Sequence, residues 1–83
     1  MREIKVDKTL DVRGMRCPYP LLKTTREVAS MMTGETLLVI TDDPMAPDNI
    51  DSWAEKEGHR VLDVNKVGRD IRIYLLKMSI GGE

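Results

Sequence analysis

The residue with the clearest capacity for chemistry is the single cysteine of the chain, Cys17. Two arginines, Arg13 and Arg16, precede it closely, and two prolines, Pro18 and Pro20, follow it. A cysteine acts as a nucleophile in its thiolate form, so its reactivity depends on whether its neighbours favour the anion. A lone thiol has no partner for an internal disulfide, so it either stays reduced or cycles.

The two prolines indicate that a helix begins at this segment. Proline is tolerated in the first helical turn because the first backbone N–H groups of a helix have no intrahelical acceptor. We predict Cys17 as the N-cap residue, with Pro18, Tyr19 and Pro20 at the first three helical positions. The N–H of Tyr19 is then the one amide placed to donate a hydrogen bond to the sulfur.

The helix N-terminus, Arg13 and Arg16 are predicted to place positive potential around Cys17. That potential favours the thiolate over the thiol, and it would also favour an ionised persulfide, Cys–S–S⁻. The prolines stiffen the segment, so we expect the sulfur on a rigid protrusion that the active site of another protein can reach. The alternative is a buried structural cysteine, which the neighbouring arginines and prolines argue against.

Metal binding and cysteine-dependent hydrolysis are poorly supported. A structural zinc site takes about four ligands, whereas Cys17 and His59 are the chain's only thiol and imidazole. A hydrolase would need His59 as a base beside Cys17. His59 follows Gly58 at the predicted end of a helix, so we expect it at the opposite end of the sheet. We therefore expect no metal and no organic cofactor.

Several side chains near Cys17 are candidates for contact with a partner protein. Met15 and Met45 are soft and adaptable, although filling of the core is the alternative for both. Lys23 and Arg26 fall off the apolar stripe of the helix and would suit an acidic partner, or they form an ordinary solvated face. Tyr19, held between the prolines, is either an exposed anchor or a ring lying over the first helical turn.

The elements that position this segment follow from the hydropathy pattern. Alternation over residues 4–12 predicts a first strand or strand pair, which Gly14 ends. From Pro18 the apolar residues fall at helical spacing, which predicts an amphipathic helix of about four turns with its stop at Gly34. The apolar stripe of this helix consists of Leu21, Thr25, Val28 and Met32, widened by Leu22 and Ala29.

A central strand and a second helix are predicted next. Residues 36–41 form a β-rich run without alternation, as expected of a strand paired on both edges. Asp42 and Asp43 then offer an acidic N-cap, with Pro44 at the first helical position, for a helix over about residues 44–57.

Two last strands, residues 60–64 and 71–75, form a hairpin around a turn over residues 66–70. The order β-α-β-α-β-β predicts an α/β (α+β) two-layer sandwich with a mixed four-stranded sheet, both helices on one face and the other face open. A chain of 83 residues is expected to be one domain, covering residues 1–83.

The composition, 41% hydrophobic and 33% charged, is typical of a globular protein. The longest apolar run, residues 37–40, is far short of the roughly 20 residues that span a bilayer, and residues 1–5 lack the apolar stretch of a signal peptide. We expect a cytoplasmic protein without membrane contact, and a monomer.

Charge is distributed unevenly along the chain. Residues 1–34 hold seven Lys/Arg and four Asp/Glu, a net +3, whereas residues 35–83 hold six and ten, a net −4. Positive charge in the half that contains Cys17 favours an anionic substrate or an acidic partner surface, and it argues against direct nucleic-acid binding. Ordinary solvated charge is the alternative.

The segment from Leu10 to Pro20 resembles Leu-Asp-x-Arg-Gly-x-x-Cys-Pro-x-Pro, the signature of the TusA/SirA-like sulfur carriers. The likeness extends along nearly the whole chain, through Gly34-Glu35, Asp42-Asp43-Pro44, Ile50, Trp53 and Gly58-His59. It implies a β-α-β-α-β-β two-layer fold with Cys17 as the sulfur-carrying residue. The residues that would support Cys17 are Arg13, Gly14, Arg16, Pro18, Tyr19 and Pro20.

The resemblance further implies that Cys17 accepts sulfane sulfur as a persulfide from a cysteine desulfurase or rhodanese and passes it to an acceptor sulfurtransferase. Such a sulfurtransferase-type carrier would serve tRNA thiolation, molybdenum cofactor assembly or sulfur oxidation. The chain departs from some family members at Ala54, where they carry another cysteine, and at Asn49, where they carry an acidic residue. Without a second thiol, transfer must finish on a partner's thiol or a small acceptor.

Two other hypotheses stay open. The chain could be a non-catalytic regulatory or interaction module that uses the open face of the sheet and does not depend on Cys17. It could also be a thiol redox sensor, although it lacks the resolving cysteine that such sensors use. Loading of sulfur onto Cys17 separates both from a carrier.

Overall fold

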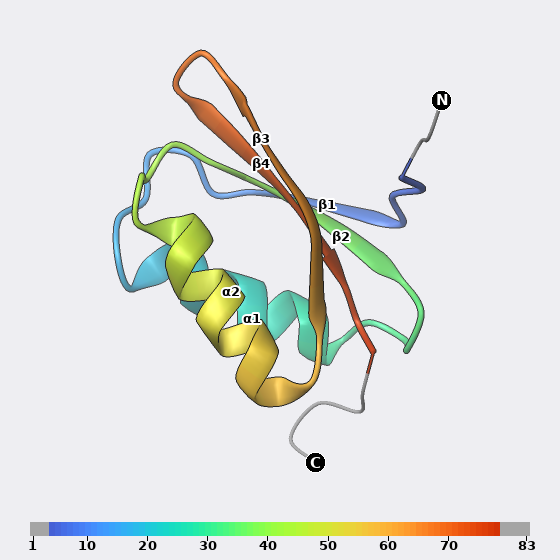
Figure 1. Cartoon of the computed structure of the whole chain (residues 1–83). Coiled ribbons are helices and arrows are strands. Elements are labelled where there is room, and N and C mark those ends of the chain that lie inside the picture. The colour runs from blue at the N-terminus through green and yellow to red at the C-terminus, as the bar shows by residue number, and fades with distance from the viewer. Residues whose placement is uncertain (1–3, 79–83) are drawn as a thin grey trace.

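The computed structural model describes residues 4–78 of the chain. Its elements follow the predicted order: β1 (Lys8–Asp11), α1 (Tyr19–Ala29), β2 (Thr36–Thr41), α2 (Ala46–Glu57), β3 (Arg60–Val67) and β4 (Asp70–Leu76). Both helices pack on one face of a four-stranded sheet, and no helix of the described residues covers the other face (Figure 1). The predicted two-layer α+β sandwich is confirmed.

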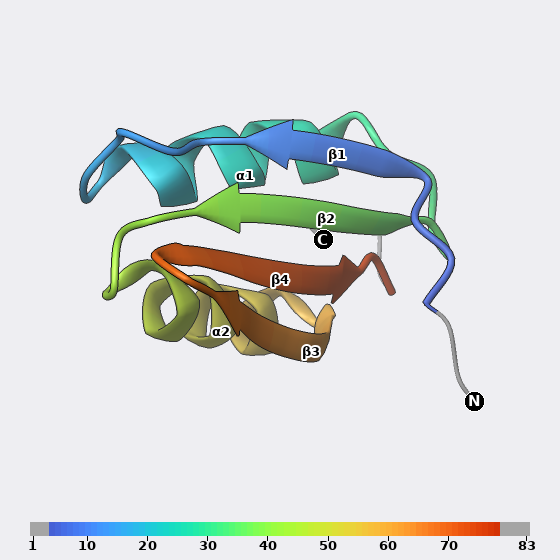
Figure 2. The same cartoon turned by 90° about the horizontal axis from the view of Figure 1, so that it is seen from above.

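The strand order across the sheet is β1-β2-β4-β3 (Figure 2). β1 and β2 are parallel, whereas β4 is antiparallel to both of its neighbours, so the sheet is mixed as predicted. β2 is paired on both edges, as predicted, and its Leu37 and Val39 are fully buried. Since α1 joins two parallel strands, the loops that leave β1 and β2 emerge at the same edge of the sheet. Both helices begin at that edge.

The core lies between the sheet and the helices and is built from aliphatic side chains. Ile73 and Leu75 of β4 and Ile50 and Ala54 of α2 all belong to this buried cluster. Each fully buried leucine or isoleucine contributes about 1.5–3 kcal/mol relative to an exposed one. This packing fixes where both helices start, and with them the loops at the shared edge.

α1 is shorter than predicted, because it ends at Ala29 rather than near Gly34. The buried Lys77, which follows β4, donates from Nζ to the carbonyl oxygens of Val28 at 2.8 Å and Met31 at 2.7 Å. These bonds join Lys77 to the last turn of α1 and to the turn that follows it, where helix carbonyls lack intrahelical donors. A distant lysine therefore stabilises the end of α1, which no local pattern predicts.

The buried face of α1 is also rotated from the predicted stripe. Pro20, Thr24 and Val28 are buried, whereas Leu22 and Met32 are exposed. Thr24 can occupy a core position because its hydroxyl donates to the carbonyl oxygen of Pro20 at 2.8 Å, so its polar group stays paired.

α2 begins later than predicted. Its first residue is Ala46 and its N-cap is Met45, so Pro44 lies outside the helix. The N–H of Ala46 donates to the carbonyl oxygen of Asp43 at 3.0 Å, which forms a turn before the helix. Gly58 ends α2 with a φ of 83°, as a C-terminal glycine is expected to do. Neither helix of the described residues is long and apolar enough to cross a membrane.

The strand boundaries also differ from the predictions. β1 covers a part of the predicted span, because its pairing with β2 is confined to residues 8–11. The hairpin is longer than predicted: Val67 of β3 pairs with Asp70 of β4, so the turn is Gly68-Arg69 and not residues 66–70. Gly68 has a φ of 63°, the left-handed conformation that such tight hairpin turns need.

Candidate functional site

Cys17 lies in the loop between β1 and α1, where it is exposed. Pro18 is the N-cap of α1 and Tyr19 its first residue, one position later than predicted. The N–H of Tyr19 donates to the carbonyl oxygen of Arg16 at 2.9 Å. The peptide bond between Cys17 and Pro18 is cis. The predicted hydrogen bond from Tyr19 to the sulfur is therefore wrong, because the turn that precedes α1 takes this donor.

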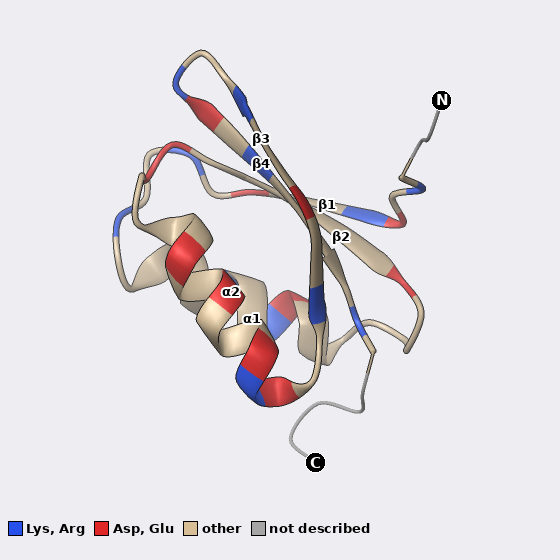
Figure 3. Cartoon of the chain, viewed as in Figure 1, with Lys and Arg blue, Asp and Glu red and all other residues tan. Residues whose placement is uncertain are grey.

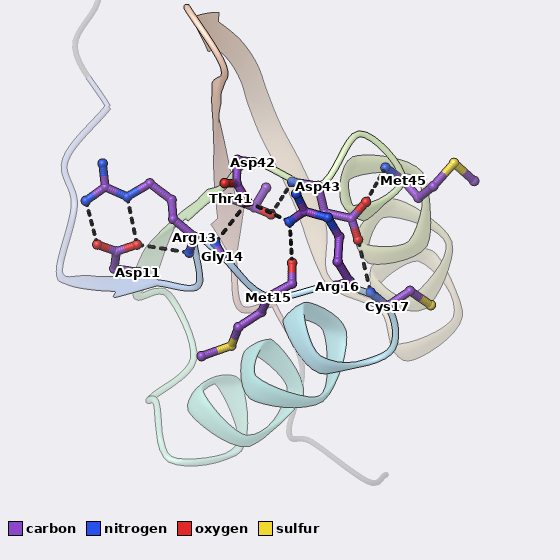
Figure 4. Close-up of polar contacts among 10 residues, drawn as sticks. All are labelled: Asp11, Arg13, Gly14, Met15, Arg16, Cys17, Thr41, Asp42, Asp43 and Met45. Atoms are coloured by element: carbon purple, nitrogen blue, oxygen red, sulfur yellow. Dashed lines mark hydrogen bonds and ion pairs between the residues drawn. The ribbon is translucent and has the colours of Figure 1, made fainter.

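Asp43, in the loop between β2 and α2, holds the backbone of Cys17. Its Oδ2 accepts the N–H of Cys17 at 3.1 Å, and its Oδ1 accepts the N–H of Met45 at 3.0 Å. Asp43 is 4% exposed, and its own N–H donates to the hydroxyl of Thr41 at 3.1 Å. One buried carboxylate therefore joins the Cys17 loop to the start of α2 (Figure 4).

Asp42 holds the same loop a few residues earlier. Its Oδ1 accepts the N–H of Gly14 at 3.0 Å and Nη1 of Arg16 at 3.0 Å. The hydrogen bond from Gly14, supported by Arg16, lowers the pKa of the Asp42 carboxyl. Gly14 has a φ of 84°, in the left-handed region that favours glycine. The prediction that this acidic pair caps α2 is wrong, because the N-cap is Met45 and no side chain caps the helix. The pair instead fixes the loop that carries the cysteine.

Arg13 ties the loop to the sheet. It donates to Asp11 from Nη2 at 2.7 Å and from Nε at 3.0 Å, and from Nη1 to Asp70 of β4 at 3.2 Å. The hydrogen bond from Arg13 lowers the pKa of Asp11 to about 2. The Arg13 side chain is directed toward Asp11 and away from Cys17 (Figure 4).

Arg16 is also engaged by other groups, since its Nη1 donates both to Asp42 and to the carbonyl oxygen of Met15 at 3.0 Å. The basic positions of this loop lie beside the acidic positions of the loop between β2 and α2 (Figure 3). Opposite charges at such short distance cancel most of their outward field. Both guanidinium groups are therefore paired with carboxylates and help to hold the loop, and the positive potential expected at the sulfur stays a prediction.

The side chain that reaches the sulfur comes from α2. Nδ2 of Asn49 lies 3.9 Å from Sγ of Cys17, as a hydrogen-bond donor. Within residues 4–78 no other hydrogen bond to this sulfur is present. The sulfur thus sits between the N-terminal ends of both helices, with one neutral donor beside it.

The surface next to Cys17 includes several of the predicted docking residues. Tyr19 is 59% exposed, and together with Leu22, Lys23 and Arg26 it lines a hollow of about 190 Å³ on α1. The two cations thus lie beside an exposed aromatic ring, and tyrosine and arginine are residue types enriched at protein interfaces. Of the two methionines, Met45 is 57% exposed, whereas Met15 is half-buried and packs against the core.

His59 lies at the other end of α2 from Cys17. It is buried, its Nδ1 accepts the N–H of Met78 at 3.3 Å, and its ring centroid lies 5.3 Å from that of Trp53. Because α2 has 12 residues, its two ends are about 18 Å apart. His59 is therefore not placed to act as a base for Cys17. Across residues 4–78, no group of three or more His, Cys, Asp or Glu side chains is placed to hold a metal ion.

Three residues of the site were not predicted in their observed roles: Asp42 and Asp43, interpreted as helix caps, and Asn49. A signal for the first two existed, because residues that follow a strand parallel to β1 lie at the same edge as the loop after β1. Nothing in the local sequence indicates that Asn49 contacts the cysteine. That contact depends on the packing of α2 beside α1.

The structure is a small two-layer α+β sandwich that presents an exposed thiol at one edge of its sheet. The chain matches the family model described as Sulfurtransferase TusA over residues 8–77. The protein therefore belongs to the TusA/SirA-like family, as its motif predicted.

Three relatives from different organisms carry the name "Putative sulfur carrier protein". The chain is 42% identical over 76 residues to that of Thermotoga maritima, which covers 90% of this chain and 96% of the relative. It is 38% identical over 76 residues to that of Archaeoglobus fulgidus, and the match covers 92% of this chain and 86% of the relative. It is 37% identical over 79 residues to that of Aquifex aeolicus, covering 95% of this chain but 40% of that longer protein.

A crystal structure of a SirA-like protein from Desulfitobacterium hafniense is similar in fold. The TM-score is 0.77 at 22% sequence identity, and the match covers 87% of this chain and 99% of that one. At this identity the comparison shows the shared fold.

Proposed function

We propose that this protein is a sulfur carrier that accepts sulfane sulfur as a persulfide on Cys17 and passes it to a partner protein. The observation that carries the proposal is an exposed cysteine whose backbone is fixed by a buried carboxylate, Asp43, at the edge where both helices begin. Membership of the TusA family and the names of three relatives support it.

The chemistry is an exchange of one sulfur–sulfur bond for another. The Cys17 thiolate attacks the terminal sulfur of a donor persulfide, the donor's sulfur–sulfur bond breaks, and the donor leaves as a thiolate. In the second step an acceptor thiolate attacks the terminal sulfur on Cys17, and Cys17 is released as a thiolate. The transferred sulfur keeps its oxidation state, so neither step needs an external oxidant or reductant.

The geometry suits transfer between proteins better than catalysis on a small molecule. Cys17 projects from a surface loop, and a group on the surface can enter the active site of another protein. Asp42 and Asp43 hold that loop through three hydrogen bonds, to Gly14, Arg16 and Cys17. A fixed loop loses little conformational entropy when a partner binds it.

The proposed partners are a donor of the cysteine desulfurase or rhodanese type and an acceptor sulfurtransferase. The hollow on α1 around Tyr19, with Lys23 and Arg26, suits a partner with an acidic rim and an apolar centre. The exposed Met45 adds an adaptable apolar contact on the other side of Cys17. We place the protein in the cytoplasm, in relays such as tRNA thiolation, molybdenum cofactor assembly or sulfur oxidation.

Sulfur loading tests the proposal. Incubation with a cysteine desulfurase and free cysteine should raise the intact mass of the protein by one sulfur atom, and a thiol reductant should remove the added mass. The Cys17→Ser variant should fold normally, because the side chain is exposed, and should gain no mass. Equal loading of both proteins would contradict the proposal. Capture of the same partners by both proteins, without any sulfur adduct, would instead support a non-catalytic interaction module.

A further inference from the structure

The amide and the two guanidinium groups predicted to stabilise the sulfur anion form hydrogen bonds to other groups. The amide of Tyr19 donates to Arg16, the guanidinium of Arg16 donates to Asp42 and Met15, and Arg13 donates to Asp11 and Asp70. Figure 4 shows the Cys17 side chain extending away from the guanidinium of Arg16. A surface thiol that must alternate between anion and persulfide therefore needs another donor.

Asn49 has the geometry of that donor. Its Nδ2 lies 3.9 Å from Sγ of Cys17, within the longer range usual for hydrogen bonds to sulfur. Its backbone N–H donates to the carbonyl oxygen of Met45 at 3.2 Å, which places Asn49 in the first turns of α2. Its side chain is half-buried, so its freedom to turn away is limited.

The contact is held by a second connection between the same two elements. The carboxylate of Asp43 accepts the N–H groups of both Cys17 and Met45, at 3.1 and 3.0 Å. Met45 is also the residue to whose carbonyl Asn49 is bonded. A chain of hydrogen bonds therefore runs from the backbone of Cys17 through Asp43 and Met45 to Asn49 and back to the sulfur. This closed circuit sets the position of the amide relative to the sulfur.

We propose that Asn49 is the residue that stabilises the anionic sulfur of Cys17, both before loading and when the sulfur is delivered. The first part needs only a reactive thiol, whereas the second rests on the proposed carrier function. In delivery, the bond between Sγ of Cys17 and the terminal sulfur breaks as the acceptor thiolate forms a new one. The electron pair returns to Sγ, and the Asn49 amide donates to the thiolate that leaves.

An amide is well suited to this task because it is neutral. It stabilises the anion through one hydrogen bond. It adds no positive charge, which would stabilise the thiolate more strongly and lower its nucleophilicity further. Raising the thiolate fraction always lowers the intrinsic nucleophilicity of each thiolate to some degree, so a single weak donor is a compromise between the two. An aspartate at position 49 would instead place negative charge beside the sulfur.

The rate of alkylation of Cys17 by iodoacetamide tests the first part. At about pH 7, where the thiol form of an ordinary cysteine dominates, Asn49→Ala should react about threefold more slowly than the wild type, the loss expected for one weak hydrogen bond to an anion. Asn49→Asp should react about tenfold more slowly, less so at high salt. At about pH 10, where the thiolate dominates, the alanine variant should react at least as fast as the wild type.

Two further variants separate a role at the sulfur from a general change in charge or structure. Asn49→Gln keeps the amide donor and should recover part of the rate at about pH 7. Asn65→Asp makes the same chemical change at the chain's other asparagine, on β3, and should leave the rate unchanged. A wild-type rate in Asn49→Ala at about pH 7 would overturn the proposal, whatever the rate of Asn49→Asp. An equal loss at both pH values would also overturn it, because it would show a structural effect.

Sulfur delivery tests the second part separately. The persulfide form of each variant, isolated after loading, is mixed with excess cysteine, and release of the added mass is followed in time. Asn49→Ala should release its sulfur about threefold more slowly than the wild type, and equal release would overturn this part. If the wild type itself gains no sulfur, the carrier function fails, whereas the alkylation result still decides the role of Asn49.

Discussion

The carboxylate of Asp43 accepts the backbone N–H of Cys17 at 3.1 Å, although 26 residues separate them in the sequence. This bond joins the loop after β1 to the loop after β2, and Asp43 is buried at the point where they meet. A buried acceptor that serves two amides is costly to lose, because both donors would be left without a partner. The presentation of the cysteine and the stability of the fold are therefore coupled through this residue.

Replacement of Asp43 by asparagine should destabilise the protein. An asparagine side chain offers one oxygen and one NH2 group, so it can accept one of the two N–H groups of Cys17 and Met45 and opposes the other. We expect a loss of about 2 kcal/mol in the free energy of unfolding, measured by urea denaturation. Asp51→Asn, an exposed position on α2, is the control and should change it by less than about 0.5 kcal/mol. Equal stability of the two variants would show that Asp43 does not hold the loop.

Lys77 should contribute to stability through the end of α1. Its Nζ donates to the carbonyl oxygens of Val28 and Met31, and it is 5% exposed. Lys77→Met keeps a long apolar side chain but removes the donor, so we expect a loss of about 2 kcal/mol in the free energy of unfolding. Lys8→Met, which removes an exposed ion pair with Glu27, should cost under about 1 kcal/mol. A smaller effect at Lys77 than at Lys8 would contradict this assignment.

His59 should make the stability depend on pH. Burial, and next the nearby charge of Lys77, lower the pKa of His59 below the ordinary histidine value of 6.5. Above pH 6.5 both the folded and the unfolded state are neutral at this residue, so it contributes no pH dependence. As the pH falls through 6.5, the unfolded state takes up a proton that the folded state resists, and stability decreases.

The measurement that checks this is the free energy of unfolding of the wild type and of His59→Gln between about pH 7.5 and pH 5. Since the chain has one histidine, the decrease over this range should be present in the wild type and much smaller in the variant. A steeper decrease in the variant would show that the histidine is protonated more easily in the folded state.

Charge on α1 should control the rate at which a donor delivers sulfur. Reversal of both cations beside the Tyr19 hollow, in the double variant Lys23→Glu and Arg26→Glu, should slow loading by a cysteine desulfurase about tenfold at low salt. The difference should shrink near 1 M salt, where charges are screened within about 3 Å. Lys56→Glu, near the C-terminal end of α2, should leave the rate nearly unchanged. Equal effects at both sites would show that net charge matters and the α1 surface does not.

The sequence was sufficient for the fold, and it correctly predicted an exposed rather than a buried Cys17. Hydropathy periodicity predicts all six elements, because the apolar residues that give the pattern on β2, β4 and α2 form the buried core. Boundaries were less accurate where a distant residue decides them, as Lys77 does at the end of α1. The local sequence of a helix does not indicate that a residue near the other end of the chain, here Lys77, donates hydrogen bonds to its last turn.

The surroundings of the cysteine were predicted less well for the same reason. Arginines near Cys17 in the sequence suggest a positive field. In the structure their guanidinium groups donate hydrogen bonds to the carboxylates of Asp11, Asp42 and Asp70. The contact of Asn49 with the sulfur exists because α1 and α2 begin at the same edge of the sheet. The local sequence indicates which loop carries Cys17, whereas the contacts of Cys17 come from Asp43 and Asn49, which are distant in the sequence.

The central claim is that Cys17 carries one transferable sulfur atom. The most direct measurement is the amount of thiocyanate formed when cyanide is added to the loaded protein, because cyanide reacts with sulfane sulfur to form thiocyanate. The protein is first loaded by a cysteine desulfurase and then separated from it. We predict one thiocyanate per chain, since there is one cysteine, and none from Cys17→Ser. A wild-type protein that yields no thiocyanate, or a serine variant that yields as much as the wild type, would contradict the account.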